Sequence, residues 1–174
     1  MKKYLLVFCA LLLAIPATAA EVETIFGAGI GQEVGPTGEA FNIATTGVRV
    51  KTWENGASIW TTLNYGQYVE ENIDALGGSL WLACPWWAAK DPDNLVKGVS
   101  ILVDVGAFSK IRDAGDGDRA LGFHVGAGLD FQLTDILHMQ VTGKAFNTGP
   151  QQKLTKVALL TFAVSPKFII GGAK

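Results

Sequence analysis

The two histidines of the chain are the side chains with the widest range of chemistry near neutral pH. His124 shares an every-second-residue polar face with Asp130, and His138 lies on the polar face of the next stretch of chain. Two imidazoles on neighbouring strands could hold a metal ion, and an imidazole beside a carboxylate could act as a general base. A histidine that acts as a base in catalysis would need a nearby nucleophile, and no serine lies two residues from His124 on its face. We therefore favour an interior hydrogen-bonding network.

Two other stretches carry residue types that bind ions or phosphates. Asp113, Asp116 and Asp118 could ligate Ca²⁺, but their spacing lacks the EF-hand pattern and fits a solvated loop tip. The glycines from Gly27 to Gly31 are followed by no helical pattern, which argues against a nucleotide-binding loop. We therefore expect no catalytic residue, no cofactor and no metal.

The elements that would position these residues have a period of two. Apolar residues alternate with small or polar ones over residues 121–133, and the alternation resumes over residues 137–145. This period is typical of β-strands, because successive side chains leave opposite faces of the backbone. Thr134 and Asp135 form a short polar link between the two runs. The pattern predicts an antiparallel hairpin.

The chain after residue 20 repeats this unit. Turn-forming residues such as Asn55 and Gly56 separate further alternating runs. The apolar face changes phase near Gly47, which predicts a β-bulge. Pro85 and the polar cluster from Lys90 to Asn94 predict the end of another strand. Eight strands are expected, at residues 22–34, 39–51, 57–69, 76–86, 98–111, 121–133, 137–146 and 154–168.

The composition argues against several classes of protein. Of the 174 residues, 49% are hydrophobic and 17% are charged, which argues against disorder. The 21 glycines argue against a helical fold. The net charge of -2 gives no electrostatic reason for binding nucleic acid.

The first twenty residues have the pattern of a secretory signal peptide. Lys2 and Lys3 precede an apolar run, and small residues follow Pro16. We predict a cleaved segment at residues 1–20 and a single domain at residues 21–174. Cys84 is then the one cysteine of the mature chain, so no intrachain disulfide is expected.

Strand length and the distribution of charge indicate a barrel that spans a membrane. Strands of globular proteins average about 5–6 residues, whereas a membrane-spanning strand needs about 9–11. The apolar face between Val99 and Ala145 carries no charge, and one Lys or Arg at the bilayer midplane would cost about 2–4 kcal/mol. The ionic residues are therefore expected to pair inside the barrel. This interior polar network is predicted to comprise Asp104, Lys110, His124, Asp130, His138 and Lys144.

Aromatic residues occur where a membrane barrel needs them. Alternate turns of an up-and-down barrel lie at the same end, and Trp and Tyr at both rims mark the two bilayer interfaces. The predicted interfacial aromatics are Trp53, Tyr65, Tyr68, Trp86 and Trp87. The same rings could instead cap the core of a soluble barrel.

The hairpin over residues 121–141 resembles the penultimate hairpin of small bacterial outer-membrane barrels of the OmpA/OmpX type. In that group a Gly-x-Gly-Leu/Val-Asp-Tyr/Phe strand ends in a Thr-Asp turn, and here Gly126-Ala-Gly-Leu-Asp-Phe131 precedes Thr134-Asp135. The resemblance implies an all-β, eight-stranded antiparallel up-and-down transmembrane β-barrel in the bacterial outer membrane. It implies no particular activity.

Three functions remain open from the sequence. The first is a non-enzymatic outer-membrane protein with a structural or interaction role, a packed polar interior and at most a very narrow pore. Its expected partners are membrane lipid and a protein at the extracellular loops, and the barrel is expected to be monomeric. The second is a soluble, secreted or periplasmic lipocalin-like barrel that binds an apolar ligand. The third is a lipid-modifying enzyme of the outer membrane, motivated by His124.

Overall fold

The computed structural model of the chain describes residues 22–34, 38, 40–51, 57–68, 74–111, 120–148 and 153–168. Among them all regular secondary structure is β-strand, and no helix is long and apolar enough to cross a bilayer. The predicted signal peptide, the aspartates at 113–118 and Trp53 lie outside the described residues, as do the side chains of Tyr68 and Lys110. The strands are β1 (Val22–Glu33), β2 (Ala40–Lys51), β3 (Ser58–Tyr68), β4 (Asp74–Ala88), β5 (Gly98–Ile111), β6 (Ala120–Gln132), β7 (Leu137–Thr148), β8 (Lys153–Val164) and β9 (Lys167–Phe168).

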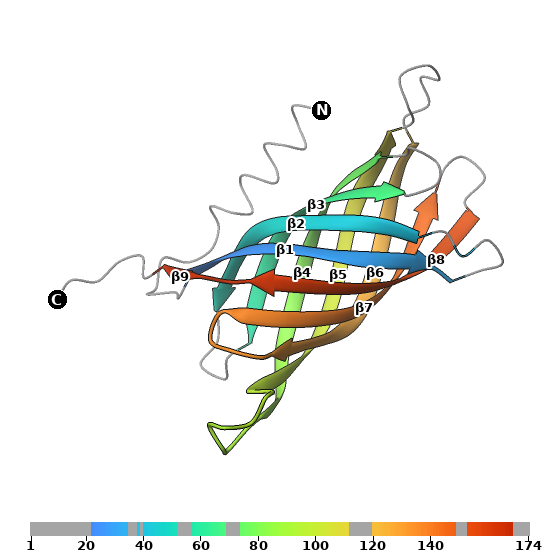
Figure 1. Ribbon diagram of the computed structural model, residues 1–174. Coiled ribbons are helices and arrows are strands. Elements are labelled where there is room, and N and C mark those ends of the chain that lie inside the picture. Colours follow the sequence, from blue (N-terminus) through green and yellow to red (C-terminus); the bar gives the residue numbers. More distant parts are fainter. Residues whose placement is uncertain are drawn as a thin grey trace.

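The first eight strands close into a barrel (Figure 1). Each strand pairs antiparallel with the next along the chain, and β1 completes the ring by pairing with both β2 and β8. β9 continues the register of β8 against β1 after a break at Ser165 and Pro166, where proline cannot donate to the ladder. The predicted eight-stranded antiparallel up-and-down barrel is confirmed.

The wall of the barrel has an apolar outer face and a largely polar inner face. Phe123 is 65% exposed and Val125 59%, whereas Asp130 on the same strand is 2% exposed. Directly paired residues on neighbouring strands share a face, so the unbroken registers from β5 to β8 carry this alternation from strand to strand. The predicted outward orientation of the apolar rows is confirmed. Further exposed apolar residues on the outer wall are Phe26, Ile30, Leu63, Leu80, Leu82, Ile101, Val103, Val105, Val141 and Phe162.

The apolar outer face forms a belt of limited height. We call the end where β1 begins the near end, and the opposite end the far end. On β1 the belt runs from Val22 to Ile30, a rise of about 20 Å along the barrel axis at about 3.3 Å per residue and a tilt of about 40°. The apolar band of membrane barrels is about 25 Å tall, so the belt suits a bilayer. Its far-end edge is marked by the exposed polar residues Gln32, Asn42, Gln67 and Asn147.

The bulge predicted at Gly47 is wrong. Both registers of β2 run through Gly47 without a shift. The apolar face changes along β2 for another reason, because Phe41 and Ile43 point inward and pack with Val157 and Leu159 in an apolar part of the lumen. The inward residues of a strand are therefore apolar where the strand borders an apolar layer of the interior.

The strand predicted to end near Trp86 ends two residues later, before the polar cluster at residues 90–94. β4 continues past Pro85 to Ala88, and a register shift between Pro85 and Trp87 marks a bulge against β5. Pairing with β3 ends at Ala83, so Pro85 lies beyond that ladder, where a missing N–H is tolerated. The bulge leaves Trp86 and Trp87 exposed next to each other on the wall.

Candidate functional site

Side chains fill the lumen of the barrel in alternating layers. Along β5, for example, the inward residues from the far end to the near end are Phe108, Asp104 and Leu102, all of them buried. An apolar layer at the far end is followed by a polar cluster, a second apolar layer and a second polar cluster. The far-end polar cluster comprises Thr45, Thr62, Asn64, Ser79, Asp104, His124 and Lys144, and the near-end polar cluster comprises Glu23, Arg49, Ser58, Asp130, His138 and Gln140.

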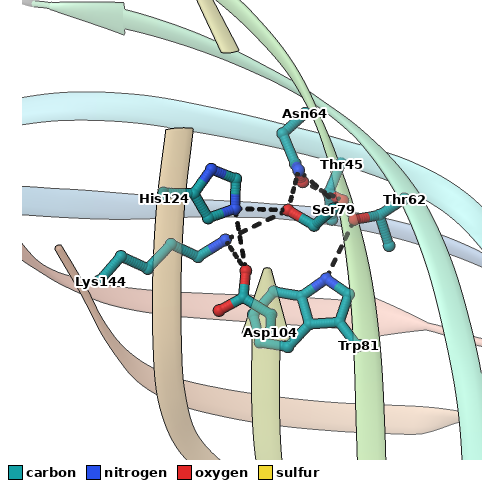
Figure 2. A network of polar contacts seen from close by, with 8 residues as sticks. All are labelled: Thr45, Thr62, Asn64, Ser79, Trp81, Asp104, His124 and Lys144. Carbon is teal, nitrogen blue, oxygen red and sulfur yellow. Dashed lines mark hydrogen bonds and ion pairs between the residues drawn. The ribbon is translucent and has the colours of Figure 1, made fainter. Parts of the chain in front are cut away.

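The far-end polar cluster is centred on a buried ion pair (Figure 2). Lys144 Nζ lies 2.9 Å from Asp104 Oδ2, and His124 Nε2 lies 3.0 Å from the same oxygen. Asp104 is 1% exposed and Lys144 is 6% exposed, so both charges are removed from bulk water. Burying either charge alone would be costly, so each of the two charges needs the other as its partner.

Hydroxyl, amide and indole groups surround this ion pair (Figure 2). Asn64 Nδ2 donates a 3.0 Å hydrogen bond to Ser79 Oγ, and Trp81 Nε1 donates a 3.1 Å hydrogen bond to Thr62 Oγ1. The Lys144 ammonium lies 4.4 Å from the centroid of the Trp81 ring, in a cation–π contact. The cluster thereby connects every strand from β2 to β7 across the lumen.

The near-end polar cluster contains a second buried ion pair. Arg49 Nη1 lies 3.3 Å from Glu23 Oε2, and Arg49 Nε donates a 3.0 Å hydrogen bond to Ser58 Oγ. The guanidinium carbon lies 4.8 Å from the centroid of the Trp60 ring, and Trp60 Nε1 donates to the same serine at 2.8 Å. These contacts join the near ends of β1, β2 and β3.

His138 belongs to the near-end polar cluster and not to that of His124. His138 Nδ1 lies 2.9 Å from Asp130 Oδ2, and Gln140 Nε2 donates a 3.2 Å hydrogen bond to Asp130 Oδ1. The rings of Trp60 and His138 are nearly perpendicular, with a centroid distance of 6.4 Å. The two histidines therefore lie in different layers, and no group of three potential metal ligands occurs among the described residues.

Five of the six predicted network residues have described side chains, and all five are buried and face the lumen. The structure brings together Asp104, His124 and Lys144, and separately Asp130 and His138. Sequence analysis missed Glu23 and Arg49, although each continues the inward alternation of its strand and could have been found from that period.

Sequence analysis also missed Ser79, and its contact with His124 raises the question of nucleophilic catalysis. Ser79 Oγ lies 3.0 Å from His124 Nε2, which is the same nitrogen that contacts Asp104. A Ser-His-Asp triad needs the serine on one ring nitrogen and the carboxylate on the other. Here Nδ1 of His124 has no hydrogen-bond partner in the described part of the chain. Ser79 is also 2% exposed, so the geometry suits a structural network.

Apolar layers separate and close off the polar clusters. Trp60, Trp81 and Leu102 are the largest members of the layer between the clusters. At the far end, Phe108 and Phe146 meet edge to face at a centroid distance of 4.9 Å. An interior void lined by residues such as Thr45 measures about 20 Å³, room for about one water molecule.

Inward-facing glycines make room for these bulky side chains. A Cβ atom added to Gly106 would lie 2.4 Å from Cε1 of His124 and 2.2 Å from the carbonyl oxygen of Gly78. One added to Gly126 would lie 2.0 Å from Asp104 Oδ1. Glycine is therefore required at both positions by the close approach of the polar cluster to the wall.

The sequence matches no family model and no curated protein. The structure is similar to the N-terminal barrel domain of OprF from Pseudomonas aeruginosa, with a TM-score of 0.54 and 13% identity over 84% of this chain and 99% of that chain. Neisserial surface protein A is similar with a TM-score of 0.53 and 12% identity, over 87% of this chain and 100% of that chain. A de novo designed transmembrane β-barrel is similar with a TM-score of 0.53 and 11% identity, over 83% of this chain and 95% of that chain. The chain has the fold of the small outer-membrane β-barrels.

Within this outer-membrane barrel fold, the predicted interfacial aromatics with described side chains lie on the outer wall. Trp86 and Trp87 lie close to the near end of the barrel and are 69% and 48% exposed. Tyr65 lies toward the far end and is 45% exposed. The hairpin of β4 and β5 that carries the two tryptophans extends beyond the rest of the near end (Figure 1). This distribution fits ring positions at both bilayer interfaces.

Proposed function

We propose that the protein is a non-enzymatic outer-membrane barrel with a structural or interaction role and a closed interior. One observation carries this proposal: the apolar side chains form a belt on the outside, while the ion pairs are enclosed. An apolar outer wall is stable when it faces lipid hydrocarbon. Charges buried in a narrow lumen are stable only when they are paired. The barrel is proposed to be a monomer, surrounded by lipid and able to bind a protein at its extracellular loops.

Membrane insertion is tested by fractionation and by gel mobility. We expect the protein to sediment with outer membranes and to be released only by detergent. Because a closed barrel resists unfolding by dodecyl sulfate without heat, boiled and unboiled samples should migrate differently. Recovery of a folded monomer from the periplasm in detergent-free buffer would contradict the proposal.

The closed lumen predicts the absence of ion conductance. The apolar layers around Trp81 and Phe108 lie across the path that an ion would take, and dry apolar constrictions block ions. In planar bilayers we expect no discrete current steps from purified, heat-modifiable protein, with a known porin as the positive control. Reproducible steps whose size is altered by substituting Trp81 would show that the lumen opens.

The two other functions have weaker support. A lipocalin-like barrel needs an apolar interior, whereas this lumen holds two buried ion pairs. A lipid-modifying enzyme has only the Ser79–His124 contact in its favour. If the enclosed His124 is structural, a folded His124→Ala variant should leave the lipid profile of the membrane unchanged. A changed profile would favour the enzyme.

A further inference from the structure

A hollow on the outer wall has no part in the closed interior described above. It measures about 530 Å³ and lies across β6, β7 and β8 in the far-end half of the belt. The hollow is broad and mostly open rather than enclosed. The outward residues that line it include Val34, Ala127, Gly143, Ala145, Lys156 and Ala158.

Paired small residues form the floor of the hollow. Ala127 pairs with Gly143, which pairs in turn with Ala158, so three small residues lie side by side across three strands. Among the described residues, a Cβ atom added to Gly143 would meet one atom within 4 Å, the carbonyl oxygen of Val157 at 4.0 Å, so these residues leave the space above it open. Large residues bound the floor on its near-end side, where Leu129, Val141 and Leu160 form the next paired row.

A cation lies at the far-end side of this hollow. Lys156 is exposed, faces outward next to Ala145, and makes no ion pair within the described part of the chain. Val34 N donates a 2.7 Å hydrogen bond to the Lys156 carbonyl oxygen, which fixes the backbone at this rim. The exposed amide side chain of Gln32 lies on the neighbouring strand, opposite Ala158. A positive charge at the polar edge of an apolar belt attracts anionic headgroups.

We propose that this hollow binds one anionic membrane lipid, in the bilayer leaflet that surrounds the far-end half of the barrel. An acyl chain would occupy the floor of small residues, and the negatively charged phosphate headgroup would lie against the Lys156 ammonium. The hollow supplies apolar contact, and Lys156 supplies the preference for charge. The inference rests on the proposed membrane insertion, because only an embedded barrel presents this wall to lipid.

Lipid retention in native mass spectrometry tests the proposal. The full-length barrel is released from neutral detergent micelles that contain phosphatidylglycerol or phosphatidylcholine with identical chains. We expect one phosphatidylglycerol to be retained preferentially, and Lys156→Gln to weaken that binding about fivefold, because one basic residue near a membrane surface contributes about 1 kcal/mol. Lys90→Gln, which removes another exposed lysine in the near-end β4–β5 connection, should change nothing.

A second pair of variants distinguishes the contribution of the hollow to lipid binding from that of the Lys156 charge. Gly143→Val fills the floor and should reduce the retention of both lipids, whereas Gly78→Val, at an outward glycine on β4 with similar free space, should not. Equal retention of the two lipids, or an unchanged preference in Lys156→Gln, would overturn the proposal. A dimer that Gly143→Val abolishes would assign the hollow to a second copy of the chain. Loss of heat-modifiable mobility in the parent protein would instead overturn membrane insertion, and the lipid site with it.

Discussion

Replacing Lys144 with methionine is expected to lower the free energy of unfolding by about 3–5 kcal/mol, because it leaves the Asp104 carboxylate buried without its cation. Asp104 is 1% exposed, and its Oδ1 atom has no hydrogen-bond partner in the described part of the chain. The remaining contact with His124 Nε2 at 3.0 Å replaces the lost charge only if the imidazole is protonated. Guanidinium unfolding of the barrel in lipid vesicles, followed by tryptophan fluorescence, measures the change.

A double variant distinguishes a paired charge from simple loss of packing. Asp104→Leu combined with Lys144→Met removes both charges, and such replacements of buried ion pairs are often neutral or stabilising. We expect the double variant to be more stable than Lys144→Met alone, which gives a coupling energy in the mutant cycle. Lys90→Met, at an exposed position, should stay within about 0.5 kcal/mol of the parent. A cost for Lys144→Met no larger than that of Lys90→Met would contradict the account of the far-end polar cluster.

Arginine in place of Val103 is expected to destabilise the inserted barrel by about 2–4 kcal/mol, because it puts a charge at mid-height of the lipid-facing belt. Val103 is 50% exposed and lies midway along β5 between Val99 and Ala107. The side chain faces away from the lumen, so no interior carboxylate can pair with the new guanidinium. Unfolding and refolding in vesicles of defined lipid measure the difference.

The matched control lies at the edge of the belt. Asn147 is exposed, faces outward on β7 and pairs with Phe123, at the far-end limit of the apolar surface. Asn147→Arg should cost only about 0–1 kcal/mol, because the penalty for a charge falls toward the interface. If the two arginines were tolerated equally well, Val103 would not be facing hydrocarbon.

The sequence predicted the strands and their faces because both depend on a local period of two. Phe123 and Asp130 could be assigned to opposite faces from their spacing alone, and the barrel places them so. Because the apolar rows carry no charge, they could be assigned to the outer, lipid-facing side of the barrel. Closure of β1 on β8 followed from the number and length of the strands.

The sequence did not predict which inward residues meet. Ser79 and His124 are 45 positions apart and come into contact only through the registers of β4, β5 and β6. No position was predicted for Trp81, which faces the lumen with Trp60 in the apolar layer between the two polar clusters. The prediction of a bulge at Gly47 failed because an inward apolar layer has the same local pattern as a change of strand phase.

A spin label at Val103 tests most directly whether the apolar rows face hydrocarbon. The label is attached to Val103→Cys in a chain with Cys9→Ser and Cys84→Ser, and a second label at Leu95→Cys, on the 82% exposed tip of the β4–β5 connection, serves as the aqueous reference. In vesicles, we expect the Val103 label to be highly accessible to oxygen and poorly accessible to a water-soluble nickel chelate, with the reverse for the Leu95 label. A Val103 label that is readily reached by the nickel chelate, or reached by neither reagent, would contradict this expectation.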